Sequence, residues 1–178
     1  MIREQRFSTL ALFGLLLFTI ACADRTAAEA VPSQSSSTGA TSATQSADPA
    51  ADALLAELVP NYLPIMDSLA DDSLPNAIAG AEAFESALLA LDSPESQLSD
   101  LSLAAAGIRQ ATDIEAARGE FAELSKTMIA LWRSAAEKSG TVVAHCSMAD
   151  ESWLQTDAPL SNPYYGSEML RCGEVAER

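Results

Sequence analysis

Residues 112–135 read TDIEAARGEFAELSKTMIALWRSA, and this stretch decides the fold class. Apolar side chains recur in it at spacings of three and four residues, which is the repeat of one helix face. They are Ile114, Ala117, Phe121, Leu124, Met128, Leu131 and Ala135. Thr112 or Asp113 can cap the N-terminus, and Gly140 stands where a glycine would end the helix. The pattern predicts an amphipathic helix with one buried face.

Three earlier segments carry the same repeat. The first begins at Asp48-Pro49 and ends at the turn Asp71-Asp72-Ser73, the second runs from Ser73 or Leu74 to Asp92-Ser93-Pro94, and the third from about Ser96 to Gln110. Pro60 and Pro64 lie inside the first segment and predict a kink or a break. The apolar faces include Ile65 and Leu69 in the first, Phe84, Leu88 and Leu89 in the second, and Leu98, Leu101, Leu103 and Ile108 in the third. We interpret Met66, Phe84, Phe121, Met128 and Trp132 as core residues.

Four amphipathic helices with short connections predict an antiparallel up-and-down four-helix bundle over residues 48–139. After Gly140 the chain changes character. Residues 141–144 are short and largely β-branched, so we expect an extended segment there. Residues 145–172 are expected to be a loop with one helical turn near residues 167–170. The predicted fold class is therefore all-α, with a C-terminal irregular Cys/Met-containing segment over residues 140–178.

A cluster of soft metal donors lies in the C-terminal segment. They are Cys146, Met148, Met169 and Cys172, and His145, the one histidine, precedes them. Thiolate and thioether sulfur select monovalent copper and similar soft ions. A metal site made of these five residues would take Cu(I) or Ag(I).

Other interpretations of these residues stay open. A Cys146–Cys172 disulfide would close a loop of about 27 residues and stabilise the fold by roughly 3–4 kcal/mol. A redox pair would bind metal when reduced and close when oxidised. Met148 and Met169 can instead fill gaps in the core, and His145 can simply form a local hydrogen bond.

The remaining side chains of the segment predict how it folds. Trp153, Tyr164 and Tyr165 are expected to pack it onto the bundle. Asn162-Pro163 and Gly166 are turn residues, which would fold the second half of the segment back on the first. The two cysteines should then lie close together.

Three motifs in this region carry a resemblance to a known family. They read HCSMA at residues 145–149, WLQ at 153–155 and NPYYGSEMLRCGEV at 162–175, and residues 69–72 and 121–125 add to them. Together they resemble an uncharacterised helical domain family, over roughly residues 50–178. Its members occur alone as exported proteins, or fused to periplasmic adaptor subunits of copper/silver-type resistance-nodulation efflux pumps. Ser147 departs from the proline usual in that family. The resemblance implies a periplasmic domain associated with heavy-metal handling, with an efflux adaptor or a metallochaperone as partner.

Residues 1–21 are expected to be an export signal. Arg3 and Arg6 precede an apolar run, Leu10–Ile20, which is too short to span a bilayer. Residues 19–22, TIAC, resemble a bacterial lipobox, which implies a diacylglyceryl group on Cys22. Because Ala23 follows this cysteine, the similarity implies sorting to the outer membrane. An ordinary signal peptide cleaved after Ala23 is the alternative.

Composition bounds the rest of the chain. Residues 23–47 are mostly Ala, Ser, Thr and Gln without apolar periodicity, which predicts a disordered linker, either a tether or a spacer. The 25 acidic against 10 basic residues argue against nucleic acid and anionic lipid as partners. The acidic excess fits cations or a basic partner, or solubility alone. No glycine-rich phosphate loop or zinc-protease spacing occurs, so we expect no enzyme.

These observations predict a lipid-anchored, periplasm-facing domain that binds Cu(I) or Ag(I) and buffers the ion or delivers it to an efflux system. The alternative is a structural or interaction module. In that case the Cys146–Cys172 disulfide staples the C-terminal segment without a metal, and the acidic bundle docks on a partner.

Overall fold

The computed structural model describes residues 48–91 and 95–178. The predictions for residues 1–47, the export signal, the lipidated Cys22 and the linker, lie outside the described residues, and so does the predicted end of the second helix. The elements are α1 (Pro49–Ala70), α2 (Leu74–Ala90), α3 (Glu95–Gln110), α4 (Ile114–Ser134), β1 (Thr141–Cys146), β2 (Glu151–Thr156), the 3-10 turn η1 (Gly166–Glu168) and β3 (Glu174–Glu177).

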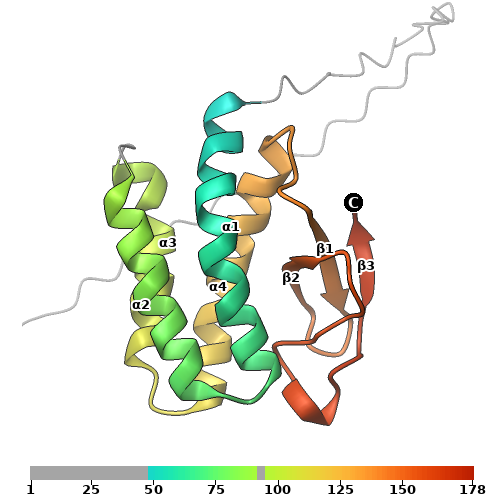
Figure 1. Ribbon diagram of the computed structural model, residues 1–178. Coiled ribbons are helices and arrows are strands. Elements are labelled where there is room, and N and C mark those ends of the chain that lie inside the picture. The colour runs from blue at the N-terminus through green and yellow to red at the C-terminus, as the bar shows by residue number, and fades with distance from the viewer. Residues whose placement is uncertain (1–47, 92–94) are drawn as a thin grey trace, which may run out of the picture. The chain divides into compact units, whose positions relative to one another are not determined.

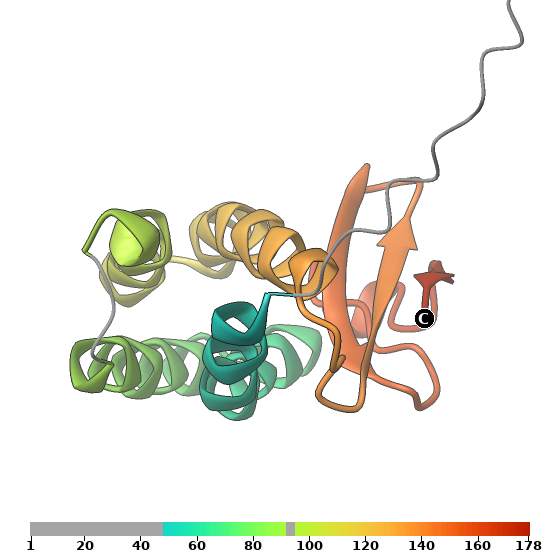
Figure 2. The same cartoon turned by 90° about the horizontal axis from the view of Figure 1, so that it is seen from above.

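The four helices form an up-and-down bundle, as predicted. Seen from above, α1 and α4 lie next to the strands, and α2 and α3 make the far side (Figures 1 and 2). The predicted caps are confirmed: Asp48 accepts a hydrogen bond from the Ala50 amide at 2.9 Å, and Asp113 from the Ala116 amide at 2.9 Å. The five predicted core residues are all buried, namely Met66, Phe84, Phe121, Met128 and Trp132.

Some details of the helix predictions are wrong. Leu89 and Leu103 were assigned to apolar faces but are 83% and 74% exposed, because α2 and α3 are the outer pair and bury only one narrow face each. α4 ends at Ser134, well before Gly140, because Ala135 adopts an extended conformation. Gly140, with φ +69°, instead forms the turn into β1. Pro60 and Pro64 do not break α1.

The all-α fold class is also wrong, because residues 141–178 form a three-stranded antiparallel sheet rather than an irregular segment. The strand order is β2-β1-β3, with Ala144 opposite Trp153 in one pair and opposite Val175 in the other. β1 and β2 are joined by a tight connection in which Asp150 has φ +55°. Each strand is short and gains its hydrogen bonds only from partners elsewhere in the segment. Local sequence pattern therefore gives little sign of them.

The sheet packs against α1 and α4 (Figure 2). Leu154 is fully buried, and its amide donates to the Tyr62 hydroxyl at 3.2 Å, which lies 2.8 Å from the hydroxyl of Ser125. Phe121 stacks on Tyr62, with ring centroids 5.2 Å apart. Helices and sheet thus share one core. In the described part of the chain, no helix is long and apolar enough to cross a membrane.

Candidate metal or redox site

The structure brings Cys146 and Cys172 together. Cys146 is the last residue of β1 and is buried, whereas Cys172 is half-buried in the turn before β3. Their Sγ atoms lie 3.0 Å apart, and both are free thiols. A disulfide would require a further approach of about 1 Å and the transfer of two electrons to an oxidant, with loss of both thiol protons. The arrangement therefore suits two-thiolate chemistry, either binding one ion or forming a bond.

The side chain of Asn162 holds the loop that carries Cys172. This residue is fully buried, and its Nδ2 donates to the Cys172 carbonyl oxygen at 3.0 Å. Its Oδ1 accepts the amides of Tyr164 at 2.8 Å and Tyr165 at 3.3 Å. A buried amide with these partners fixes the backbone of the loop, because leaving any of them unpaired would cost free energy.

A buried arginine fastens the same loop to the bundle. Arg118 of α4 donates to the carbonyl oxygens of Pro163 at 2.8 Å and Leu69 at 3.0 Å, and to the Asp72 carboxylate at 2.6 Å. Asp72 also accepts the Ser167 amide at 3.0 Å. One guanidinium therefore ties α1, α4 and the C-terminal segment together, as its planar fork of donors allows.

The close contact at this point requires a glycine. Gly166 has φ +54°, and a Cβ built on it would overlap the Asp72 carboxylate and the Arg118 guanidinium. Hydrogen bonds from the side chain and amide of Ser167, and from Arg118, lower the pKa of Asp72 to about 2. Asp72 is therefore a carboxylate at neutral pH and pairs with Arg118 as an ion.

The two thiols differ electrostatically. Burial alone would raise the pKa of Cys146, but hydrogen bonds from Cys172, from the amides of Ala149 and Met148 and from Asn162 outweigh it, so the pKa is lowered. The pKa of Cys172 is raised, because its thiol donates to Cys146 and burial adds to the effect. Cys146 is the first thiolate of the pair, and thiolates are the form that binds metals and attacks disulfides.

The structure separates His145 from the cysteines. Neighbouring residues of a strand point to opposite faces, so His145 and Cys146 lie on different sides of the sheet. The His145 ring is 3.0 Å from the hydroxyl of Ser152, its partner in the register, through Nδ1. The local hydrogen bond expected for a structural histidine is thus present.

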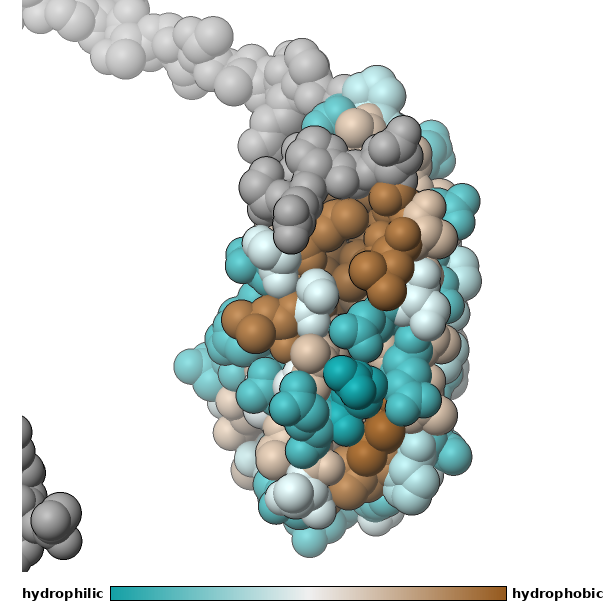
Figure 3. Space-filling view, turned by 90° about the vertical axis from the view of Figure 1, so that its left-hand side faces the viewer, coloured by the Kyte–Doolittle hydropathy of each residue, from teal (hydrophilic) through white to brown (hydrophobic). Residues whose placement is uncertain are grey.

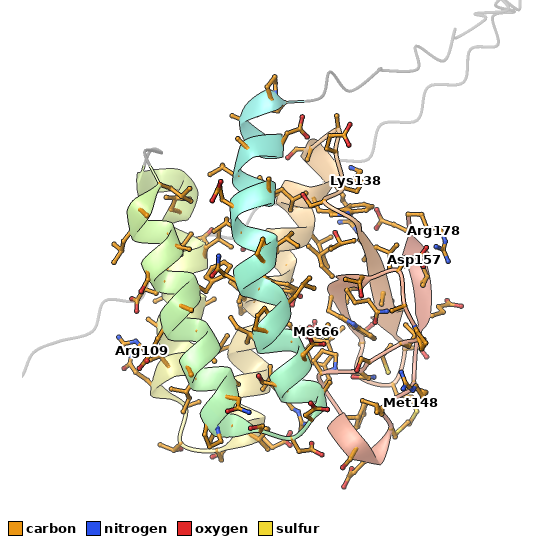
Figure 4. The ribbon with its side chains drawn as sticks, viewed as in Figure 1. Met66, Arg109, Lys138, Met148, Asp157 and Arg178 are labelled. Carbon is orange, nitrogen blue, oxygen red and sulfur yellow. The ribbon has the colours of Figure 1, made fainter. Side chains whose placement is uncertain are left out.

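The two methionines flank the cysteines through their backbones. The Met148 amide donates to the Cys146 sulfur, and the Cys172 amide donates to the Met169 carbonyl oxygen at 2.9 Å. The Met148 side chain is 63% exposed, and Met169 is half-buried. Figure 4 shows Met148 beside the C-terminal segment, outside the four helices. Neither residue belongs to the buried core.

Among the described residues, no group of three or more His, Cys, Asp and Glu side chains is placed to hold a metal ion. If an ion bound by the two thiolates takes a third side-chain donor, that donor would therefore be a methionine sulfur.

Trp153 and Tyr164 have the predicted packing role, and both are buried. The ring centroid of Tyr164 lies 5.9 Å from the ring centroids of both Phe121 and Trp153.

Two residues that position the site were missed by sequence reasoning. Asn162 was interpreted only as a turn residue, and its contacts come from chain positions that no local pattern connects. Arg118 left a readable signal: it is a basic residue beside Ala117 on the apolar face of residues 112–135. A charge in such a place predicts a buried partner.

Comparison with known proteins gives a family match for the bundle. Residues 58–140 match a domain family described as "Protein of unknown function (DUF3347)". No curated protein and no solved structure matches the chain. The matched range begins within α1, includes α2, α3 and α4, and ends one residue before β1, so it contains neither cysteine of the pair. A DUF3347 domain, of an uncharacterised family, is therefore found in this chain over residues 58–140.

Proposed function

We propose that the reduced Cys146–Cys172 pair binds one monovalent soft ion, Cu(I) or Ag(I). The observation that carries this proposal is the 3.0 Å approach of two sulfur atoms, one at the end of β1 and one in the turn before β3. Both thiols converge on one point, and thiolates select soft ions over the harder cations of the same compartment. One ion replacing the Cys172 proton would bridge the two sulfurs.

The surroundings of the cysteine pair favour replacement of the thiol proton by a metal ion. The lowered pKa of Cys146 makes its thiol easier to deprotonate when an ion binds, and the partial exposure of Cys172 gives the ion a path from solvent. Met148 and Met169 can complete the coordination with neutral donors. His145, on the other face of the sheet, is left out of the ligand set that we propose.

The wider role follows from the sequence. We propose that the chain is exported and attached through Cys22 to the outer membrane, and that its domain buffers the ion or passes it to an efflux adaptor or metallochaperone. The lipobox and the resemblance to domains fused to efflux adaptors support this. The role is one of binding and transfer, without catalysis.

An anaerobic Cu(I) titration against a competing chelator tests the binding. It uses the reduced full chain with Cys22→Ser, so that the third cysteine contributes nothing. We expect one ion per chain, and a loss of more than about 100-fold in affinity for the Cys146→Ser, Cys172→Ser variant, since both soft anionic donors are gone. Equal affinity of the two proteins would contradict the proposal.

Single substitutions define the ligand set. His145→Ala should keep the affinity, because its ring lies on the opposite face of the strand. Met148→Ala and Met169→Ala should each weaken binding by about 10-fold or less, as expected for neutral donors beside two thiolates. A large loss of Cu(I) affinity in His145→Ala, with no loss in either methionine variant, would contradict this ligand set and favour His145 as a ligand.

A structural disulfide is the second candidate function, and the same 3.0 Å contact favours it. Exported cysteine pairs usually bridge in an oxidising compartment. Thiol counting on the Cys22→Ser chain separates the two. A pair that stays oxidised in a reducing glutathione buffer is a structural disulfide. A pair that exchanges readily remains available to an ion.

A further inference from the structure

We propose that the outer face of α2 and α3 is a docking surface for a cationic amphipathic helix of a partner protein. This surface lies on the side of the bundle away from the sheet (Figure 2). It is therefore independent of the cysteine pair, and it can be occupied while Cys172 stays open to solvent.

The surface contains an apolar groove. Between the end of α2 and the start of α3 lies a hollow of about 550 Å³, whose apolar lining is Leu88, Leu89, Leu91, Leu98, Leu103 and Ala106. Figure 3 shows the apolar residues gathered on this face. Leu88 and Leu98 form its floor and belong to the core, whereas Leu89 and Leu103 stand 83% and 74% exposed.

Of the three large apolar side chains that are exposed in the described residues, two, Leu89 and Leu103, border this one groove. Scattered apolar side chains need no explanation, but a contiguous apolar patch marks a place where another molecule binds. Two adjacent helices with a groove between them accept a third helix, whose apolar residues recur at spacings of three and four. The groove therefore fits an amphipathic helix.

Acidic residues in a neighbouring hollow, which shares Leu103 with the groove, give the charge of that helix. Leu103 also borders a second hollow, lined by Asp100, Glu120 and Glu123 between α3 and α4. Lys126 pairs with Glu123 at 2.7 Å, and no basic side chain in the described part of the chain pairs with Asp100 or Glu120. A partner helix with Lys or Arg beside its leucine stripe would meet uncompensated carboxylates along this edge.

The same charges decide against other occupants. A second copy of the chain would bring its own net charge of −15 to this surface. Anionic lipid would be repelled in the same way. At the other end of the groove, Arg109 is held by Glu85 at 3.2 Å and offers little attraction to an acidic partner. A cationic helix is the occupant that both the apolar and the acidic features favour.

Peptide binding to the full chain tests the proposal. The probe is a labelled synthetic helix of about 18 residues, with leucines at helical spacing and lysines on both flanks, followed by fluorescence anisotropy. Leu89→Ser with Leu103→Ser should weaken binding by about 10-fold or more, because the apolar contact is lost. Both residues are exposed, so the variant should keep its melting temperature, which circular dichroism checks.

The charge component needs a matched pair of variants. Asp100→Asn with Glu120→Gln should weaken binding about 3–5-fold at low salt, and added salt should abolish the difference. The control variant, Glu57→Gln with Glu137→Gln, also removes two negative charges, but outside this surface. Its loss of peptide affinity, expressed as log Kd, should be less than about half of that seen for Asp100→Asn with Glu120→Gln. A control peptide with glutamate in place of lysine should bind at least about 10-fold more weakly than the lysine peptide.

Four results would overturn the proposal. The first two are unchanged peptide binding by the Leu89→Ser, Leu103→Ser variant and equal binding of the lysine and glutamate peptides. The third is a homodimer of the unsubstituted chain that this variant no longer forms. The fourth is adsorption of the unsubstituted chain to phosphatidylcholine vesicles that this variant no longer shows. The last two would assign the groove to a second copy or to a lipid surface.

Discussion

The helical bundle and the C-terminal sheet are held together by different kinds of interaction. In the bundle, apolar side chains at helical spacing pack on one another, and the buried residues are nearly all aliphatic or aromatic. In residues 141–178, folding depends on strand pairing and on two polar hubs, Asn162 and Arg118. The bundle supplies bulk and rigidity, and the smaller part carries both of the thiols in the described residues.

Under the proposed function, this difference separates the region that supplies stability from the region that carries the thiols. A site that must expose a thiol cannot bury enough apolar surface to hold itself, so it takes its stability from a neighbouring core. The shared residues are few: Phe121 and Tyr62 on the helices, and Leu154 and Tyr164 from the segment. Changes at these contacts should affect both regions, and changes outside them only one.

The largest effect is expected from Phe121→Ala. Its ring contacts Tyr62 at 5.2 Å and Tyr164 at 5.9 Å, so the cavity opens where bundle and sheet meet. We expect a loss of about 3–5 kcal/mol in the free energy of unfolding, measured by urea denaturation. Leu89→Ala is the control on an exposed position and should cost less than about 0.5 kcal/mol. Similar losses for both would mean that the shared core is misplaced.

Oxidation of the cysteine pair should stabilise the sheet region next most. Cys146 and Cys172 are 26 positions apart, and closing that loop is worth about 3–4 kcal/mol in the chain-entropy model. Urea denaturation of the oxidised and reduced Cys22→Ser chain measures it. A reduced chain as stable as the oxidised one would contradict this contribution of the disulfide.

Arg118→Ala should loosen the sheet from the bundle. It leaves two carbonyl oxygens and the Asp72 carboxylate without a buried donor, for which we expect a loss of about 2–3 kcal/mol. Hydrogen exchange should increase first in residues 161–173 and only later in α2 and α3. Arg109→Ala, which breaks the more exposed pair with Glu85, should cost less than about 1 kcal/mol. An equal increase in hydrogen exchange along the whole chain would contradict the role of Arg118 in fastening residues 161–173 to the bundle.

The smallest effect concerns pH. Because the folded-state pKa of Asp72 is lowered to about 2, its contribution is present above the ordinary aspartate range and is lost as pH falls through the folded value. Asp72→Asn should therefore lower the melting temperature at pH 7. The difference from the unsubstituted chain should shrink between about pH 4 and pH 2. A difference in melting temperature that stays constant at all pH values would show that the charge of Asp72 does not contribute to stability.

The two regions also differ in how far sequence predicts them. The periodicity of residues 112–135 and the caps Asp48 and Asp113 predicted the helices, since each signal is local. The repeats of the second and third helices assigned Leu89 and Leu103 to the apolar faces, although both side chains are exposed, because a repeat does not tell which helices form the outer pair. β2 and β3 were missed, because their stability comes from pairing with β1 across turns and a long connection.

The candidate site was predictable in its residue types and less so in its geometry. Soft donors near each other in sequence indicated Cys146 and Cys172, and turn residues predicted their approach. The opposite orientation of His145 could not be inferred without knowing that residues 145 and 146 continue β1. Asn162 and Arg118 act through contacts about 10 and 45 positions away along the chain, which a single sequence does not reveal.

We propose that residues 141–178, and not the bundle, carry the function through the Cys146–Cys172 pair. The most direct test measures bound Cu(I) per chain, under anaerobic conditions, on the reduced and oxidised forms of the Cys22→Ser protein. We predict one ion on the reduced form and none on the oxidised form, with the helical circular dichroism unchanged. Equal loading of both forms, or none on either, would contradict the account.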